Sequence, residues 1–325
     1  MKFTHVVTAL LAATSLSAAV SAVAADSFPS RPLRVLVPNG PGSSVDTLTR
    51  IVTNRLGETL GQQIVVDNRA GAGGVIGMEI GKDANPDGYT LITATTAAST
   101  IARLLLKNPP YHPVNDYDSV AQFAVTLNVL VVANSLPVKT VPELIAYAKS
   151  GKKPFNMSSA GIGSQSHLSG AYFVQESGIK SLHVPYKGGG ASSRSVASGE
   201  SQWSLIPSAA AMNHVAAKRM RAIGHSLSHT TPLLPDIRPI SETIPGFDYT
   251  GWMGFFAPKG TPKAVIEKLR AAVAKTMEAA EVKKGMAFQA TEIVVLGPDQ
   301  FRKEVQKSMV KNAALIKTVG LKATN

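Results

Sequence analysis

The sequence predicts an α/β protein made of two α/β units in series. Two stretches share one construction, in which an apolar strand runs into a loop of glycine and serine and then into an amphipathic helix. The first stretch covers residues 33–46 and the second covers residues 155–167. Strand-like and helix-like segments alternate along much of the remaining chain, a pattern typical of mostly parallel sheets covered by helices.

The first 25 residues have the features of a secretory signal peptide. A basic residue is followed by an apolar run from Val6 to about Ala13, and small residues precede Asp26. This run is shorter than the ~20 residues that a membrane-spanning helix needs. We therefore expect cleavage near Ala24 or Ala25 and export of a soluble chain of about 300 residues.

The first unit is expected to begin with the strand at residues 33–37. The helix after the glycine-serine loop carries an apolar face, formed by Val45, Leu48, Val52, Leu56 and Leu60. Further strands are expected at residues 64–66 and 89–92, because these runs are β-branched or aromatic and are bounded by Gly, Asn and Asp.

The second unit is expected to begin with an apolar strand at residues 129–132. The elements expected after it are a helix at 141–149, a strand at 155–158, a helix at 166–176, and strands at 182–186 and 203–206. A return segment is expected at residues 249–258. A helix is expected from Thr261-Pro262, because proline is favoured at the first helical position. A last helix is expected from near Pro298, including Phe301, Val305, Met309, Ala313 and Ile316.

The composition excludes several classes of site. The chain has no cysteine, so disulfide scaffolds, thiolate metal sites and cysteine nucleophiles are excluded. The formal net charge is +12, but the basic residues are spread along the chain and only 6% of residues are aromatic, which argues against nucleic-acid binding. A positive field instead favours the arrival of anionic ligands.

The two glycine-serine loops are the main candidate sites. The first N–H groups of a helix lack partners within that helix and carry the positive end of its dipole, so each loop is suited to bind an anion. We expect ligand contacts from Asn39, Gly42, Ser43 and Ser44 in the first loop, and from Ser159, Ala160, Gly161, Gly163 and Ser164 in the second. Helix capping by the serines, or an ordinary strand-to-helix turn, is the alternative interpretation.

Other polar residues are assigned around these loops. Thr95 and Thr96 follow a predicted strand and are expected to bring hydroxyl groups to the ligand. Asp46 is expected to hold the first loop rather than touch a carboxylate, since both carry negative charge. His167 is expected to support the second loop, and Tyr186 is expected either to support it or to pack between the domains.

Seven ordered motifs cover nearly all of the chain after residue 25. They are VPNGPGSSVD at 37–46, DNRAGAGG at 67–74, PDGYTL at 86–91, SAGIGSQSHL at 159–168, HVPYKG at 183–188, LPD at 234–236 and APKGTP at 257–262. In this order they resemble the Bug family, the periplasmic receptors of tripartite tricarboxylate transporters.

The resemblance implies a type II periplasmic binding protein, with two α/β domains joined by hinge strands around a central cleft. It places domain 1 at residues 26–128 and 249–325 and domain 2 at residues 129–248. It also implies a small organic carboxylate as ligand, held by backbone amides, hydroxyls and water. Delivery to a permease of one large and one small membrane subunit, a periplasmic location and a monomeric state are further expectations.

The chain departs from the family pattern at several positions. Asn39 and Gly40 replace the usual Phe and Pro, and Ser43 replaces a glycine. Ser195 and Gln202 stand where the family usually has aspartates, and alignment therefore makes both candidate ligand contacts. The expected site is more polar and less negatively charged than usual, which favours a doubly anionic ligand or one without an ammonium group.

Two other functions stay open. An exported serine hydrolase would use Ser164 and His167, which are close enough in one helix to meet, although no acidic third member or nucleophile elbow accompanies them. A receptor of the same fold would instead pass its ligand to a sensor kinase. No cofactor is expected, and the spacing of the histidines does not match a metal site.

Overall fold

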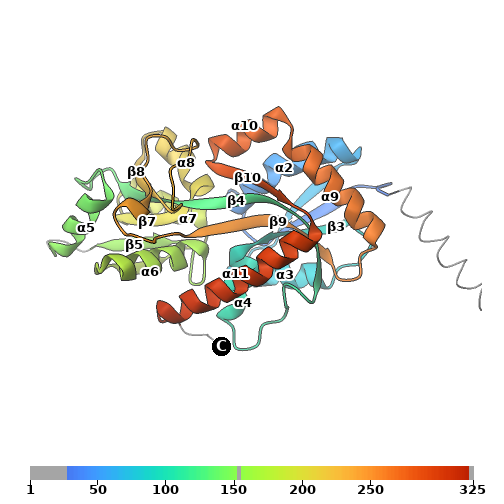
Figure 1. Cartoon of the computed structure of the whole chain (residues 1–325), viewed down its shortest axis with the longest axis horizontal. Helices are drawn as coiled ribbons and strands as arrows, with labels where there is room; N and C mark the ends of the chain where they lie inside the picture. The colour runs from blue at the N-terminus through green and yellow to red at the C-terminus, as the bar shows by residue number, and fades with distance from the viewer. Residues whose placement is uncertain (1–27, 152–154, 322–325) are drawn as a thin grey trace, which may run out of the picture.

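A computed structural model describes residues 28–151 and 155–321 of the chain, which form two lobes side by side (Figure 1). The predicted signal peptide lies outside the described residues. The strands join in a single ten-stranded sheet that runs through both lobes. No helix in the described part of the chain is both long and apolar enough to cross a membrane.

The first lobe contains a mixed sheet with the order β2-β1-β3-β9-β4. Its strands are β1 (Leu33–Val37), β2 (Ile64–Asn68), β3 (Thr90–Thr95), β9 (Thr250–Pro258), β10 (Thr291–Leu296) and the first part of β4 (Tyr117–Ala133). β1 is parallel to β2 and β3, whereas β9 is antiparallel to both β3 and β4. β10 pairs with the other side of β4.

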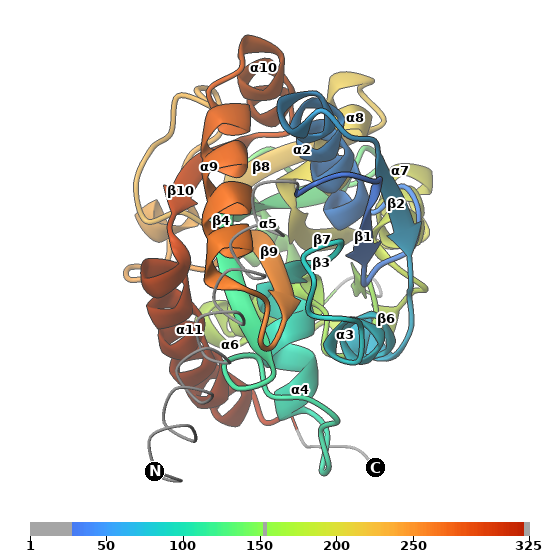
Figure 2. The same ribbon diagram turned by 90° about the vertical axis from the view of Figure 1, so that its right-hand side faces the viewer.

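Helices cover both faces of this sheet. One face packs on α2 (Ser44–Leu60), α9 (Lys263–Met277) and α10 (Ala280–Phe288). The other face packs on α3 (Val75–Lys82), on the π-helix Ala97–Ile101 with the short α4 (Ala102–Leu104), and on α11 (Pro298–Thr318). Figure 2 shows α2 and α10 above the sheet and α3 and α4 below it.

The second lobe repeats this layered arrangement on a smaller scale. Its strands are the last part of β4, β5 (Asn156–Ser159), β6 (Leu182–Pro185), β7 (Trp203–Pro207) and β8 (Met220–His225). One face packs on α5 (Val141–Lys149) and α6 (Gln165–Ser177), and the other packs on α7 (Gly189–Ser198) and α8 (Ser208–Ala216).

Two extended segments carry the chain between the lobes. β4 pairs with β9 from Tyr117 to Leu127 and with β7 from Asn128 onward, so a single strand belongs to both lobes. The return passage precedes β9, where the Tyr249 N–H donates to the Ser226 carbonyl of the second lobe before pairing with β4 begins at Thr250.

The lobes also touch on both sides of these crossing strands. On one side, Ser208 at the start of α8 donates its hydroxyl to the Ala290 carbonyl, 2.9 Å away. On the other side, Leu105 after α4 and Leu315 of α11 pack into the core of the second lobe. The two lobes are therefore in contact on both sides of the crossing strands.

The predicted α/β architecture is confirmed, and most differences are in strand length. The expected strand at 129–132 is only the end of β4, because its earlier residues carry Asp, Ser, Gln and Thr and lack the apolar run. β3 continues to Thr95 rather than ending at Ile92. Pro262 is the N-cap of α9 rather than its first helical residue, whereas Pro298 does begin α11.

Candidate functional site: two matched loops at the junction of the lobes

The two glycine-serine loops have the same backbone geometry. In the first loop (residues 39–43) the Ser43 N–H donates to the Gly40 carbonyl at 3.2 Å, and in the second loop (residues 160–164) Ser164 donates to Gly161 at 3.1 Å. The third residue of each turn has a positive φ, +72° at Gly42 and +76° at Gly163. Both are therefore type II turns, in which glycine is favoured at that position.

Each turn is fastened to the helix that follows it by two reciprocal hydrogen bonds. The N-cap hydroxyls of Ser43 and Ser164 each accept an N–H from the third residue of the helix, at 3.2 Å. That third residue differs between the loops, and its side chain reaches back to the glycine: Asp46 Oδ2 accepts the Gly42 N–H at 2.9 Å, and His167 Nδ1 accepts the Gly163 N–H at 3.1 Å. This arrangement resembles a capping box.

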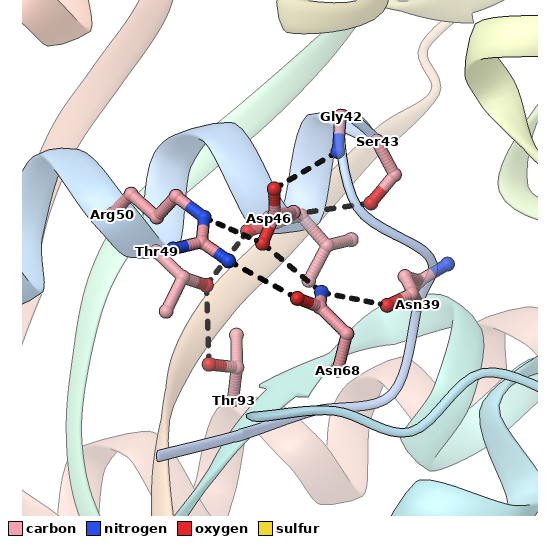
Figure 3. A network of polar contacts seen from close by, with 9 residues as sticks. Asn39, Gly42, Ser43, Asp46, Thr49, Arg50, Asn68 and Thr93 are labelled. Carbon is pink, nitrogen blue, oxygen red and sulfur yellow. Dashed lines mark hydrogen bonds and ion pairs between the residues drawn. The ribbon is translucent and has the colours of Figure 1, made fainter. Parts of the chain in front are cut away.

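Asp46 is the centre of a polar network behind the first loop (Figure 3). Its Oδ1 accepts hydrogen bonds from Arg50 Nε at 2.9 Å and from Asn68 Nδ2 at 3.0 Å. The same Asn68 amide donates to the Asn39 carbonyl. Burial alone would raise the pKa of Asp46, but the bonds from Arg50, Gly42 and Asn68 outweigh it and hold that pKa below its ordinary value. The carboxylate therefore stays charged and serves the loop.

A pair of histidines occupies the corresponding place behind the second loop. The rings of His167 and His183 stack, and His183 Nε2 lies 2.7 Å from Ser159 Oγ. Burial, together with the neighbouring His183, lowers the pKa of His167 to about 4, and burial also lowers the pKa of His183. Because His167 Nδ1 accepts an N–H, its ring is neutral with the remaining proton on Nε2. His183 lies in the motif HVPYKG but was not among the predicted site residues.

The backbone N–H groups that are free to bind a ligand lie at the helix starts and not at the glycines of the loops. The N–H groups of Gly42, Ser43, Ala160, Gly161, Gly163 and Ser164 all donate within the protein. Within the described residues, no partner exists for the N–H groups of the first two residues of each helix, which are Ser44 and Val45 in α2 and Gln165 and Ser166 in α6. These four amides are available to an anion.

The two loops meet at one junction through the start of α7. A methyl group added at Gly190 would lie 3.9 Å from the Gly42 carbonyl oxygen of the first loop. Two residues earlier, the Gly188 N–H donates to the Ala160 carbonyl of the second loop at 3.2 Å. Leu105 of the first lobe also lies against the second loop, 2.7 Å from where a Cβ of Gly163 would be.

Gln165, which was not among the predicted site residues, links the second loop to the crossing strands. Its Nε2 donates to Asn128 Oδ1 at 3.2 Å and lies 3.5 Å from Thr126 Oγ1, both on β4. The same amide packs on β9, because a methyl group at Gly251 would lie 2.7 Å from Nε2. A glutamine in the first turn of an amphipathic helix carries no distinctive sequence signal, so only the fold reveals this contact.

The threonine and serine candidates differ in how far their hydroxyls are engaged. Thr95 Oγ1 accepts the Ala98 N–H at 3.1 Å, and Thr96 Oγ1 accepts the N–H of Trp252 on β9 at 2.8 Å. Both threonines are buried, and both hydroxyl groups are already engaged. Ser44 is half-buried, and its hydroxyl has no hydrogen bond to any other described residue.

The structure engages the side chains of Ser195 and Gln202 in contacts that do not involve the loops. Ser195 is buried in α7, where its hydroxyl donates to the Ser192 carbonyl at 2.8 Å. Gln202 Oε1 accepts the N–H of Asn156, at the amino end of β5, whereas the second loop follows the carboxyl end of that strand. Tyr186 lies nearer: its N–H donates to the Ser159 carbonyl.

The hydrolase alternative required a Ser164–His167 pair. Ser164 Oγ instead accepts the backbone N–H of His167, and Nδ1 of the ring is taken by Gly163. A serine–histidine hydrogen bond does occur between Ser159 and His183, but the Ser159 side chain is fully buried and also bonded to Gly161. The residues that the structure describes contain no cluster of three or more His, Asp or Glu able to hold a metal ion.

Two surface hollows lie elsewhere on the molecule. One is lined by Gln62–Ile64 and neighbouring residues of α2, and the other by Asn156, Leu182 and nearby residues. Both are therefore at the amino ends of strands. Ligands of open α/β sheets bind beyond the carboxyl ends, where the two loops are.

A mixed α/β sheet shared by two lobes, with matched helix-start loops facing their junction, defines a type II periplasmic solute-binding protein. Residues 48–321 match the family described as "Tripartite tricarboxylate transporter family receptor". The chain belongs to this family. The prediction that it is a Bug protein is confirmed.

Individual relatives agree with this assignment. The chain is 35% identical to "UPF0065 protein in tcbD-tcbE intergenic region" of Pseudomonas sp. strain P51, covering 79% of this chain and 77% of the relative. It is 30% identical to BugT of Bordetella pertussis, covering 92% and 93%.

Two solved structures are similar in fold and carry named ligands. Rpa4515 of R. palustris, with adipate, has a TM-score of 0.87 and 28% identity, covering 90% of this chain and 98% of that one. MatC of Rhodopseudomonas palustris, with bound malate, has a TM-score of 0.81 and 28% identity, covering 89% and 100%.

Proposed function

We propose that this receptor captures a small organic carboxylate between its two lobes and delivers it to a tripartite tricarboxylate transporter permease in the membrane. The observation that carries the proposal is the junction at α7, which brings both helix-start loops to one place. The adipate and malate named for two structural relatives support a carboxylate ligand. Export to the periplasm and a monomeric receptor are parts of the same proposal.

Capture depends on both loops acting together. A micromolar dissociation constant corresponds to ~8 kcal/mol, whereas one charge-assisted hydrogen bond contributes ~1.5–3 kcal/mol before the cost of association. Two amides at the start of α2 and two at the start of α6 supply enough donors for one carboxylate-bearing ligand. The glycines and capping side chains hold these amides in place.

Closure is proposed to occur at the crossing strands. The exchange of pairing at Leu127–Asn128 and the passage at Tyr249 support a domain division at residues 128/129 and 248/249. Gln165, at the start of α6, contacts both β4 and β9. A rotation of the lobes about these strands would therefore change this contact. Ligand binding and lobe rotation would then be coupled through a single side chain.

Isothermal titration of the chain lacking residues 1–25 tests the proposal. Separate titrations with monocarboxylates, dicarboxylates, tricarboxylates, acidic amino acids and aromatic acids are expected to give one class with micromolar or tighter affinity. Bound protein should also melt at higher temperature. Absence of binding by every acid, or hydrolysis of ester and amide substrates by the pure protein, would contradict it.

A further inference from the structure

Arg194 is a cation at the junction where the two loops meet. It lies on α7, and its guanidinium folds back over the first turn of that helix: a methyl group at Gly190 would lie 3.5 Å from Arg194 Nη1. The same methyl group would lie 3.9 Å from the Gly42 carbonyl oxygen. Arg194 belongs to the second lobe, yet its charged end and the first loop of the other lobe both lie close to Gly190.

Arg194 has no acidic partner among the described residues. The other arginines, except Arg219, pair with carboxylates or donate to carbonyl oxygens, as Arg50 does with Asp46 and Arg103 with the Tyr111 carbonyl. The first turn of α7 contains no acidic residue, and a cation near a helix start opposes the helix dipole. The nearest carboxylate behind the first loop, Asp46, is already neutralised by Arg50.

Two glycines close to this contact border open space. In the described part of the chain, methyl groups added at Gly42 or at Gly188 would meet no atom within 4 Å. Gly42 belongs to the first loop that Gly190 approaches, and Gly188 lies two residues before Gly190. Arg194 is exposed, and a guanidinium binds a carboxylate through two parallel hydrogen bonds.

Building on the proposed function, we propose that Arg194 binds the second carboxylate of a dicarboxylate whose first carboxylate is held by the helix-start amides. The ligand is then a dianion long enough to reach from the loops to α7. Its selection over a monocarboxylate of the same chain length comes from Arg194.

The test compares dicarboxylates with monocarboxylates of equal length, using succinate and butyrate, glutarate and pentanoate, and adipate and hexanoate. Wild-type protein, Arg194→Gln and Arg219→Gln are titrated calorimetrically at two salt concentrations. Arg219 is the matched control, because it is another arginine without a partner in the described residues and its loss changes the net charge equally. Both variants should melt like wild type.

We expect wild type to favour at least one dicarboxylate over its monocarboxylate by about tenfold or more. Arg194→Gln should remove that preference while monocarboxylate affinity is retained, and Arg219→Gln should keep it. A preference unchanged in Arg194→Gln, or equal affinities in wild type, would overturn the role of Arg194. Failure of every carboxylate to bind wild type would instead overturn the proposed function.

Discussion

The imidazole rings of His167 and His183 stack with 3.9 Å between their centroids and 6° between their planes. One ring accepts the Gly163 N–H and the other bonds to Ser159, so the pair connects both ends of the second loop. Because burial keeps both rings neutral, the loop depends on groups that acid will protonate.

Stability should therefore fall as the pH falls from about 6.5 to about 4. An unfolded histidine takes up a proton near pH 6.5, whereas native His167 does so only near pH 4, so the unfolded state binds more protons in this window. The loss from His167 approaches about 3 kcal/mol at the acid end. Urea unfolding at pH 7.5, 5.5 and 4.5 measures it.

The control for that experiment is His167→Asn, whose side-chain oxygen can still accept the Gly163 N–H but does not titrate. Its stability should depend less on pH than that of wild type across the same range. Carboxylates elsewhere titrate equally in both proteins. Identical pH profiles would show that His167 does not sense acid.

Gly163→Val should weaken binding of the cognate acid by about tenfold or more, since a loss of about 1.4 kcal/mol is tenfold. A side chain at φ +76° is strained, and its Cβ would lie 2.7 Å from Leu105 Cδ1. Gly178→Val is the control, because its φ of +64° gives similar strain at the far end of α6. Affinity equal to that of Gly178→Val would reject the two-loop mechanism.

Asp46→Ala should destabilise the protein and weaken binding together. It removes the acceptor of the Gly42 N–H and leaves Arg50 without its carboxylate, at a cost of about 1–3 kcal/mol. Asp46→Asn, which retains an oxygen acceptor, should lose less on both counts. Thermal unfolding and calorimetric titration of the two variants provide the measurement. Equal behaviour of Ala and Asn would mean that the loop bond contributes nothing.

Gln165→Ala should lower affinity by about threefold to tenfold, the equivalent of one neutral hydrogen bond of ~0.5–1.5 kcal/mol. The substitution leaves the backbone N–H of residue 165 in place, so it tests the contact with the crossing strands alone. Gln175→Ala, on an exposed position of the same helix, is the matched control. Titration with the best-binding acid should separate them.

The sequence predicted the architecture well because its strongest signals are local. Apolar spacing located α2, and Val141-Pro142 located α5, whose observed bounds are those expected. α7 was not among the helices expected from the sequence pattern, because its two glycines and four serines hide the helical pattern. β4 was underestimated because polar residues interrupt its first half.

The site was harder to predict because it depends on contacts between distant segments. Serine N-caps and turn glycines are local features and were recognised as loops suited to anions. The engagement of Gly42 by Asp46 and of Gly163 by His167 is also local, but it reverses which amides are free. The approach of Gly190 to Gly42 joins residues of different lobes, and no pattern along the chain encodes it.

A crystal structure of the protein with its best-binding carboxylate tests the central claim most directly. Our account predicts ligand oxygens within hydrogen-bond distance, about 3 Å, of N–H groups at the starts of both α2 and α6. A ligand that touches only one of these helix starts, or binds outside the junction of the lobes, would contradict it.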